Sequence, residues 1–307
     1  MNADPIGFVR REIVLANGRT VGEGLRTDPW IEQEMLRPAF AKTEDGKPRF
    51  RLVYTELPRG HWKSGGVAAI AVAESALHPS TDVVVAAAGR EQAAIVLENV
   101  DGYLARNPEL GVLFQRRGDE RYTNAGSRIR VISSDAATAF GLGGTHRRFR
   151  SICDELTIWP SDALWVALAS ASGKVEDAQI LVLSNAGFDA ERSWQWQVRS
   201  TAAEADWGHL FSATGVLASW ITPEWVEQMR ELLPGAAFDR LIGNVWTSGS
   251  GDFVTEEQWA RCVDERLAPR ARGTAVSIET TRKWRRQLCS APGAGYPMAS
   301  NACRASA

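Results

Sequence analysis

The sequence has 307 residues, of which 44% are hydrophobic and 23% are charged, and its formal net charge is −2. This composition is typical of a globular chain with one large or two medium domains. The near-neutral charge excludes a basic footprint for nucleic acid over the whole chain, so DNA contact would need local patches such as 147–150 and 282–286. No apolar run approaches the roughly 18 residues that span a bilayer, and we expect no membrane partner.

The cysteines and histidines show no metal or disulfide pattern. The four cysteines have no CxxC spacing and no signal peptide is recognised, so we predict reduced thiols in a cytoplasmic protein. The four histidines share no ligand spacing with the cysteines, which argues against a zinc site. Apolar neighbours favour a core position for four of the tryptophans: Trp194, Trp196, Trp220 and Trp225.

Strand and helix patterns alternate along the chain from about residue 50. Short β-branched and aromatic runs predict strands at 50–55, 82–87, 129–133, 149–153 and 179–184. Helical patterns lie before or between them, at 30–35, 65–77, 91–106 and 162–170. This alternation predicts an α/β fold with a largely parallel sheet and helices on both faces.

Composition and pattern divide the chain into five segments. Residues 1–49 are polar and irregular, whereas residues 50–202 carry the alternating α/β pattern. The Trp-rich residues 203–272 are expected to form a linker region that packs on this core. A new sheet is expected to start within 273–284. Residues 285–307 are rich in Ala, Ser, Pro and Gly, which predicts a disordered tail.

The first predicted strand, the loop after it and a Lys-Ser pair at a helix start form the pattern of a phosphate-binding loop (P-loop). The loop reads Arg59, Gly60, His61, Trp62, Lys63, Ser64. In such a loop, backbone N–H groups and the helix N-terminus bind phosphate oxygens, the lysine reaches the outer phosphates of ATP, and the serine hydroxyl binds Mg²⁺. Trp62 and Leu57 stand where glycines are usual, so the pattern alone leaves a surface loop open as the alternative.

A pair of acids follows the strand at 149–153, about 90 residues after the lysine. Nucleotide hydrolysis needs a carboxylate at a strand end to hold Mg²⁺ and a neighbouring base to orient or deprotonate water. Asp154 suits the first task and Glu155 the second. The alternative is a loop with two solvated acids, but the preceding strand, loop and Lys-Ser pair favour the functional interpretation.

Small polar residues end the strand at 179–184. The segment Ser184, Asn185, Ala186, Gly187 could sense the γ-phosphate of ATP and pass the change onward. An ordinary turn between a strand and a helix would have the same composition.

With these motifs in order, the chain from about Trp30 to Trp284 resembles the large terminase subunit of tailed double-stranded DNA phages. The resemblance rests on the order and spacing of several blocks: 57–64, 86–93, 133–135 with Gly141, 153–156, 184–187 and 240–246. The last block looks like the link between the two domains of that family.

The resemblance implies a P-loop ATPase that threads viral double-stranded DNA into a capsid. Lys63 and Ser64 would bind phosphates and Mg²⁺, Arg59 would contact the γ-phosphate in cis, Asp154 would hold Mg²⁺ and Glu155 would activate water. The segment 184–187 would couple hydrolysis to movement. Two residues would flank the adenine: Trp30 and Gln33. The implied partners are a portal protein, a small terminase subunit and further copies in a ring, in the host cytoplasm or from a prophage.

The family also carries an RNase H-like nuclease domain with a two-metal site built from several acids. Residues 276–284 resemble its first strand and hairpin, and Glu279 stands where an aspartate is expected. We expect no further strand or acid of this domain after Trp284, as a frameshift, a split gene or a truncated prophage copy would leave it. We therefore predict no nuclease activity from this chain alone; metal-dependent plasmid nicking that is lost in Glu279→Ala would contradict this.

Two other functions stay open on the sequence. Another P-loop DNA translocase would need a second motor lobe or helicase motifs, and neither is recognised. A non-catalytic remnant or binding module would keep the fold without hydrolysing ATP, and Trp62 favours that alternative.

Overall fold

The computed structural model describes residues 4–15, 22–25, 28–133, 142 and 146–247, and the backbone of 276–280 and 286–290. The chain divides into two compact units, Met1–Asp252 and Phe253–Ala307, which are described separately. Within the described residues, no helix is long and apolar enough to cross a membrane.

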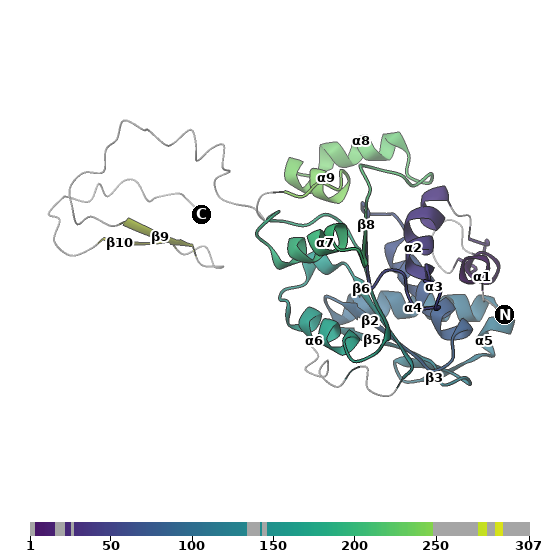
Figure 1. The fold of residues 1–307 in the computed structure, drawn as a ribbon. Helices are drawn as coiled ribbons and strands as arrows, with labels where there is room; N and C mark the ends of the chain where they lie inside the picture. Colours follow the sequence, from purple (N-terminus) through teal and green to yellow (C-terminus); the bar gives the residue numbers. More distant parts are fainter. Residues whose placement is uncertain are drawn as a thin grey trace. The chain divides into compact units, whose positions relative to one another are not determined.

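An eight-stranded sheet of order β3-β4-β5-β2-β6-β7-β1-β8 forms the centre of the first unit (Figure 1). The pairs from β5 through to β8 are parallel, whereas β3, β4 and β5 pair antiparallel at one edge. This confirms the predicted α/β fold with a largely parallel sheet. The strands are β1 (Leu52–Glu56), β2 (Thr81–Ala87), β3 (Phe114–Arg117), β4 (Glu120–Thr123), β5 (Arg128–Ser133), β6 (Arg148–Asp154), β7 (Asp177–Ser184) and β8 (Gly208–Ser212).

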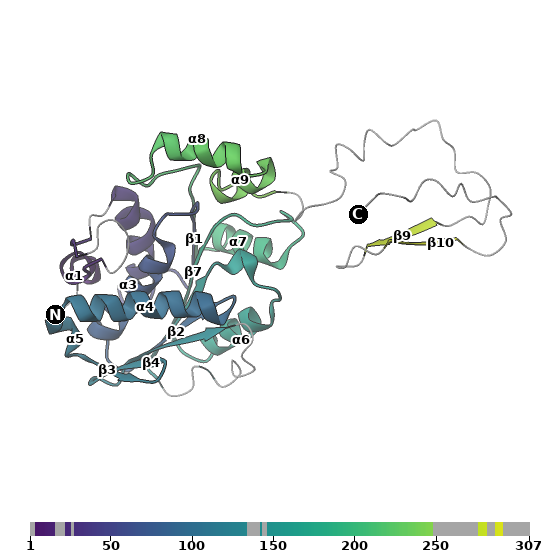
Figure 2. The ribbon, with the colours of Figure 1, turned by 180° about the vertical axis from the view of Figure 1, so that it is seen from behind.

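Helices cover both faces of this sheet, with α3 and α4 on one face and α6 and α7 on the other (Figures 1 and 2). Short helices near the N-terminus pack beside α3, and α8 and α9 follow β8. The helices are α1 (Pro5–Glu12), η1 (Ile31–Leu36), α2 (Arg37–Phe40), α3 (Lys63–Leu77), α4 (Arg90–Arg106), α5 (Pro108–Gly111), η3 (Leu156–Ile158), α6 (Ala163–Ser172), α7 (Trp194–Glu204), α8 (Pro223–Leu232) and α9 (Gly235–Leu241).

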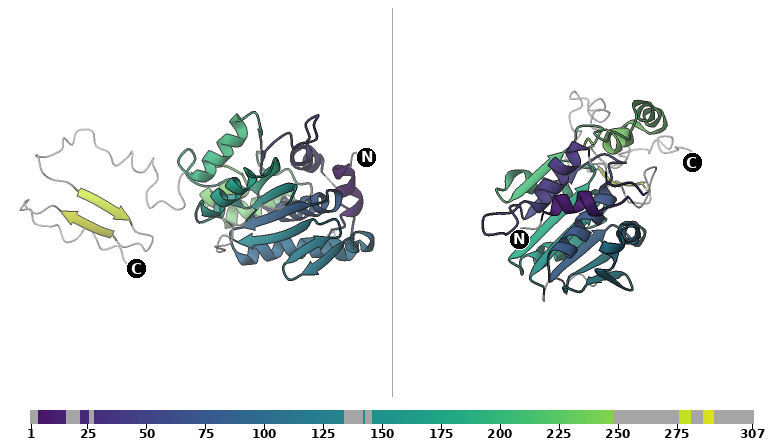
Figure 3. Two further views of the ribbon diagram at one scale, coloured as in Figure 1. Left: turned by 60° about the horizontal axis from the view of Figure 1, so that its bottom comes forward. Right: turned by 90° about the vertical axis from the view of Figure 1, so that its right-hand side faces the viewer.

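Each face of the sheet has its own hydrophobic cluster. One cluster joins α3 to the N-terminal helices, α4 and the β-branched residues of β2, and the other joins α6 to β6 and β7. Helix α3 is the most central, because small residues let it lie close to the sheet: all its residues from Gly65 to Ser75 are buried. This packing fixes the start of α3 against the sheet, which is where the P-loop ends (Figure 3).

Three features of the first unit differ from the sequence-based expectations. Strand β8 lies in the segment expected to be a linker, yet it pairs in parallel with β1 and completes the sheet. Its residues are all half-buried, so its sequence lacks the alternation that identifies a strand. The short hairpin β3–β4 and helix α7 were not expected either.

The expected core position of four tryptophans is wrong. Trp220 is 45% exposed, and Trp194, Trp196 and Trp225 are only half-buried. Their apolar neighbours lie on helices and loops at the rim of the sheet, and a bulky indole there covers the core edge without entering it.

The second unit contains an antiparallel pair, β9 (Val276–Thr280) and β10 (Arg286–Ser290). Glu279 lies on β9 opposite Gln287. A strand within 273–284 was predicted, whereas β10 corrects the expectation of no strand after Trp284, since a five-residue strand is too short to stand out in a low-complexity stretch. Several earlier expectations fall outside the described residues: the block at 134–135 with Gly141, the linker from 248 to 272, the patch at 282–286 (apart from the backbone of Arg286) and the tail at 291–307.

Candidate nucleotide-binding site

The parallel strands β1, β7 and β6 bring the three predicted segments to one edge of the sheet. Strand β7 lies between the other two, with Ser184 opposite Glu56 and Leu183 opposite Asp154. All three strands end at this edge, where ligands bind in open α/β sheets. The P-loop, the acid pair and the small polar segment, which are separated by up to about 120 residues in sequence, are therefore neighbours in the fold.

Lys63 is the first residue of α3 and is 6% exposed. Its Nζ donates hydrogen bonds to the backbone oxygens of Leu57 (3.1 Å) and Pro58 (2.9 Å) and lies 3.3 Å from Oε1 of Glu155. A buried ammonium must be paired or solvated, and here the loop carbonyls and one carboxylate do this. The positive charge thus lies at the N-terminus of a 15-residue helix, where the helix dipole also favours an anion.

Trp62 has a left-handed backbone conformation, with φ 54° and ψ 26°. An ordinary side chain pays about 1–2 kcal/mol for this conformation, which explains why glycine is usual at this position of the loop. The indole lies over the first turn of α3: a β-carbon on Gly65 would be 2.1 Å from Trp62 Nε1. The glycine missing before Lys63 is therefore matched by a glycine two residues after it, and the chain keeps the P-loop backbone with a tryptophan in it.

This arrangement predicts a strong energetic coupling between Trp62 and Gly65. Alone, Gly65→Ala should destabilise the protein, because its methyl group must displace the indole. Combined with Trp62→Gly, the same substitution should stabilise it by about 1 kcal/mol, the helix propensity gained by alanine over glycine. A double-mutant cycle by urea denaturation measures the difference, and additive effects within about 0.5 kcal/mol would contradict the predicted packing.

His61 is fully buried and fastens the P-loop to the segment after β8. Its Nε2 accepts hydrogen bonds from the backbone N–H groups of Leu217 (2.9 Å) and Ala218 (3.3 Å), and its Nδ1 faces the backbone oxygen of Arg59 at 3.2 Å. These contacts require a neutral imidazole protonated on Nδ1. Burial lowers the pKa of His61 from 6.5 to about 4, which agrees with that form.

His61 should make the protein sensitive to acid. The unfolded chain binds a proton near pH 6.5 but the folded one only near pH 4, so its contribution to stability is complete above pH 6.5 and is lost as the pH falls towards 4. The full loss corresponds to about 3 kcal/mol. Free energies of unfolding at pH 7 and pH 4 for the wild type and His61→Gln should differ in slope by this amount, whereas parallel pH profiles would contradict it.

Asp154 ends β6 and is 2% exposed. Its Oδ2 accepts a hydrogen bond from the Ser64 hydroxyl at 3.1 Å, and its Oδ1 is buried without a hydrogen-bond partner among the described residues. Burial, together with the charge of Glu155, raises the pKa of Asp154 to about 7, although the Ser64 hydrogen bond opposes the rise. A buried carboxylate with one unpartnered oxygen is unfavourable unless a cation or a proton joins it.

The Ser64–Asp154 pair fits a magnesium ion. Mg²⁺ prefers oxygen ligands and usually takes one or two from the protein and the rest from phosphates and water. The hydroxyl of Ser64 and the unpartnered Oδ1 of Asp154 are such ligands. Among the described residues no group of three or more His, Cys, Asp or Glu side chains could hold a metal by itself, so an ion here would depend on bound phosphate.

Glu155 lies between the P-loop and the segment after β7. Its backbone has φ 51° and its N–H donates to the Leu183 oxygen at 2.8 Å, which turns the side chain away from β6 towards the loop. One carboxylate oxygen lies 3.3 Å from Lys63 Nζ, and the other accepts the N–H of Asn185 at 3.4 Å. The side chain is 21% exposed, so water can reach it.

The remaining predicted residues fall at the rim of this site. Arg59 and Gly60 are exposed, and the Arg59 N–H donates to the Leu241 oxygen at 2.8 Å. Segment 184–187 is buried, and the Ser184 hydroxyl accepts the Thr157 N–H at 3.2 Å.

The two residues expected at the adenine differ in exposure. Trp30 is 8% exposed, with ring centres 5.6 Å from His61 and 6.3 Å from Trp220. Gln33 is exposed on η1. Trp30 thus packs against the aromatic residues that hold the P-loop, and its contact with a base stays a prediction.

Sequence reasoning missed two residues beside the site, Arg240 and Asn244. Burial lowers the pKa of Arg240, while the opposite charge of Glu155 raises it and the like charge of Arg59 lowers it further, which places the guanidinium near both. It stacks 4.3 Å from the ring centre of Phe188. Both residues lie in the block 240–246, but nothing in that block's own pattern indicates a contact with the P-loop.

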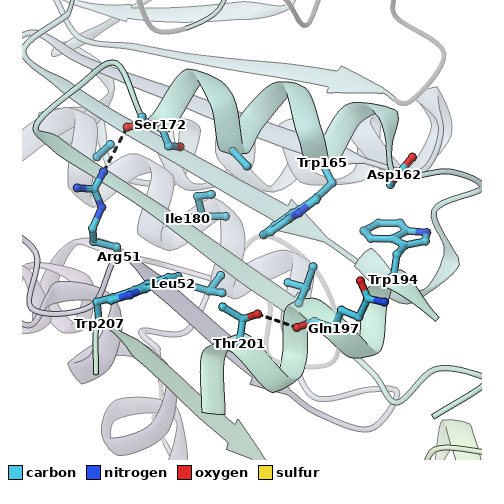
Figure 4. A pocket seen from close by; sticks show the side chains of 14 residues that line it. Arg51, Leu52, Asp162, Trp165, Ser172, Ile180, Trp194, Gln197, Thr201 and Trp207 are labelled. Carbon is cyan, nitrogen blue, oxygen red and sulfur yellow. Dashed lines mark hydrogen bonds between the residues drawn. The ribbon is translucent and has the colours of Figure 1, made fainter. Parts of the chain in front are cut away.

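A cavity of about 480 Å³ lies elsewhere, between α6 and α7 over β1 and β7 (Figure 4). Three tryptophans, Trp165, Trp194 and Trp207, line it together with Arg51, which donates to the Ser172 oxygen. None of the predicted site residues lines this cavity, so it is separate from the phosphate-binding loop.

Three solved structures share the fold. The HK97 bacteriophage large terminase aligns with a TM-score of 0.64 and 18% identity over 90% of this chain and 61% of that chain. A mutant ATPase domain of the Thermus phage P74-26 large terminase gives 0.51 and 20% over 64% and 89%. The large terminase of a thermophilic bacteriophage in complex with ADP gives 0.52 and 13% over 81% and 62%.

The sequence by itself finds no relative: no protein-family model and no curated protein matches it. The chain also spans only 61% of the HK97 protein, so the likeness concerns the part that the two share. Within that part, strand order, helix placement and the position of the P-loop agree with the alternating pattern read from the sequence. The fold of this chain is that of the ATPase domain of large terminases.

Proposed function

We propose that this chain is the ATP-hydrolysing motor of a phage DNA-packaging terminase, which drives double-stranded DNA into a procapsid. The observation that carries the proposal is the meeting of two pairs at one sheet edge. Lys63 lies 3.3 Å from Glu155, and Ser64 is hydrogen-bonded to Asp154. A phosphate-binding cation, a base and a metal-binding pair are together what phosphoryl transfer to water needs.

Each residue then has a task in hydrolysis. Lys63 and the first turn of α3 bind the outer phosphates, and Ser64 and Asp154 hold Mg²⁺, which when bound neutralises charge on the phosphates. Glu155 orients a water molecule and accepts its proton as it attacks the γ-phosphate. Arg59, exposed at the loop, contacts the γ-phosphate and stabilises the charge that develops on it.

Binding of ATP must rearrange this site before hydrolysis. Lys63 is held by two carbonyl oxygens and Glu155, and phosphate oxygens replace at least the carboxylate. Release of Glu155 from Lys63 frees it for water. The same carboxylate also holds the N–H of Asn185, so segment 184–187 senses the change and passes it on as movement of DNA.

The further parts of the proposal follow the terminases that share the fold. One of those structures contains ADP, which supports ATP as the nucleotide here. The motor works with a portal protein and a small terminase subunit, as a ring of copies, in the cytoplasm of the host. A net charge of −2 fits DNA contact confined to one face of such a ring.

ATP hydrolysis with and without linear double-stranded DNA tests the proposal. We expect hydrolysis by the wild type that rises with DNA and is lost in Lys63→Ala. Equal hydrolysis by the two proteins would contradict a motor and favour a non-catalytic binding module that keeps the fold.

A further inference from the structure

Asn244 connects the ends of three neighbouring strands. Its Nδ2 donates to the backbone oxygens of Glu56 (3.2 Å), at the end of β1, and Ala213 (2.9 Å), just after β8. Its Oδ1 accepts the N–H of Ala186 at 2.9 Å, just after β7. The side chain is 5% exposed, so water competes little for these bonds.

The groups that Asn244 holds lie one residue from both supports of the Lys63–Glu155 pair. The Glu56 oxygen precedes Leu57, whose oxygen accepts from Lys63. The Ala186 N–H follows Asn185, whose N–H donates to Glu155. One amide group, more than 50 residues away in sequence from either segment, therefore spans the two halves of the hydrolytic site.

Asparagine is the residue type that this place requires. The backbone of Asn244 has φ 58°, which asparagine tolerates better than most side chains. The side chain must also donate twice on one side and accept on the other, which a primary amide does and a carboxylate does not. Both demands are met at once, as expected of a residue that fixes a particular geometry.

We infer that Asn244 is a positioning residue for Glu155, which it acts on through the backbone of Asn185 and Ala186. This inference rests on the proposed ATPase function. The two ends of the contact differ in consequence, because the Glu56 oxygen keeps a second donor, the Ala213 N–H at 2.9 Å, when Asn244 is lost. The Ala186 N–H has only the Asn244 oxygen as a hydrogen-bond acceptor among the described residues.

The surrounding contacts restrict Ala186 and its neighbours to one path. A β-carbon on Gly187 would lie 2.8 Å from the Trp246 ring, and Trp246 Nε1 donates to the buried Glu56 carboxylate at 2.8 Å. The Asp189 N–H donates to the Thr247 oxygen at 2.9 Å. The segment containing Asn244 thus lies along 186–189, and the amide of Asn244 sets the position of the end nearest Glu155.

Steady-state ATP hydrolysis by Asn244→Gly and Asn244→Asp tests the inference. Asn244→Gly keeps the backbone conformation and removes all three bonds, so we expect kcat to fall about tenfold with the KM for ATP changed less than about twofold, the pattern of an interaction needed in the transition state. Asn244→Asp keeps the acceptor for Ala186, so it should retain more of kcat than Asn244→Gly. Because its carboxylate faces two carbonyl oxygens, it should also be the less stable protein.

That opposite ranking of activity and stability separates positioning from a merely structural role, which predicts that activity follows stability. Asn107 is a matched control, because its side chain also makes three hydrogen bonds, two to Glu12 and one to the Leu110 N–H, far from the site in sequence. Asn107→Gly should leave kcat within about twofold of the wild type. A kcat loss in Asn244→Gly no larger than in Asn107→Gly, or activities ranked as the stabilities, would overturn the inference alone.

Two further outcomes are decisive. If the wild type shows no hydrolysis above that of Lys63→Ala, the proposed function fails and the inference with it. If both Asn244 variants fail to fold, hydrogen exchange on the wild type decides: the Ala186 amide should stay protected with ADP and with a slowly hydrolysed ATP analogue alike, since Asn244 holds it throughout. Loss of protection in either state would overturn the inference.

Discussion

Glu155→Gln is expected to abolish ATP turnover while the protein still binds ATP. The substitution keeps the shape of the side chain and the backbone at φ 51°, but the amide cannot accept a proton from the attacking water. Removing a general base slows a reaction by about 10²–10⁴-fold, and we expect a loss of kcat in this range. The measurement is steady-state phosphate release with saturating ATP and DNA.

The same variant should bind ATP more tightly than the wild type does. In the nucleotide-free protein the Glu155 carboxylate lies 3.3 Å from Lys63 and competes with phosphate for it. A neutral amide competes less, so the dissociation constant of a fluorescent ATP analogue should fall by a few-fold, about 1 kcal/mol in free energy. Weaker binding together with lost turnover would contradict the base role and indicate a role in phosphate binding.

Glu98→Gln is the matched control for Glu155→Gln. Glu98 is an exposed glutamate on α4, and its substitution removes the same charge from the protein without changing the site. We expect its kcat and its ATP affinity to equal those of the wild type. A similar loss in both variants would show that net charge, and not a base at this place, decides the rate.

The main parts of the site were predictable from the sequence because short-range patterns determine them. A strand, a loop and Lys63 at a helix start place an ammonium at a sheet edge whatever the rest of the chain does. The acids at 154–155 follow a strand that alternates with helices, so a parallel sheet had to bring them to the same edge. These predictions needed only the direction of the strands, and the Ser64–Asp154 contact at 3.1 Å follows from it.

The rest depends on packing between segments that are far apart in sequence. The contact of Asn244 with Glu56 spans 188 residues, and no pattern within either segment indicates the other. His61 read as an arbitrary residue of the loop, although its ring is held by the backbone at 217–218. Strand β8 was missed because its residues are evenly half-buried, and the burial pattern that identifies a strand comes from contrast between its two faces.

Trp62 shows how a departure from a motif can be misinterpreted when only the motif is considered. Tryptophan before the lysine favoured a remnant that binds no nucleotide. In the structure the strained backbone is retained and the indole lies over Gly65, which leaves the loop closed around Lys63 as a phosphate site requires. The glycine that makes this possible was present in the sequence two residues beyond the lysine, outside the part of the motif that was compared.

Lys63→Ala should lose both ATP binding and turnover, the largest combined effect expected in this protein. Lys63 is the buried cation at the helix N-terminus, and no other residue brings an ammonium or guanidinium between the carbonyl oxygens of Leu57 and Pro58. Losing a charged contact to the transferred phosphate costs about 3–4 kcal/mol in the transition state, so kcat/KM should fall at least about 10²-fold. Isothermal titration with ATP and Mg²⁺, together with phosphate release, measures both effects.

Stability distinguishes this loss from unfolding. Removing Lys63 leaves Glu155 without its cation, but that carboxylate is 21% exposed and can be hydrated, so the melting temperature should stay close to that of the wild type. Lys174→Ala, which removes an exposed lysine from the turn after α6, should change neither binding nor turnover. A Lys63→Ala protein that melts like the wild type and still hydrolyses ATP at its rate would show that the buried ammonium serves the fold alone, and the assignment of this sheet edge to phosphate would then be wrong.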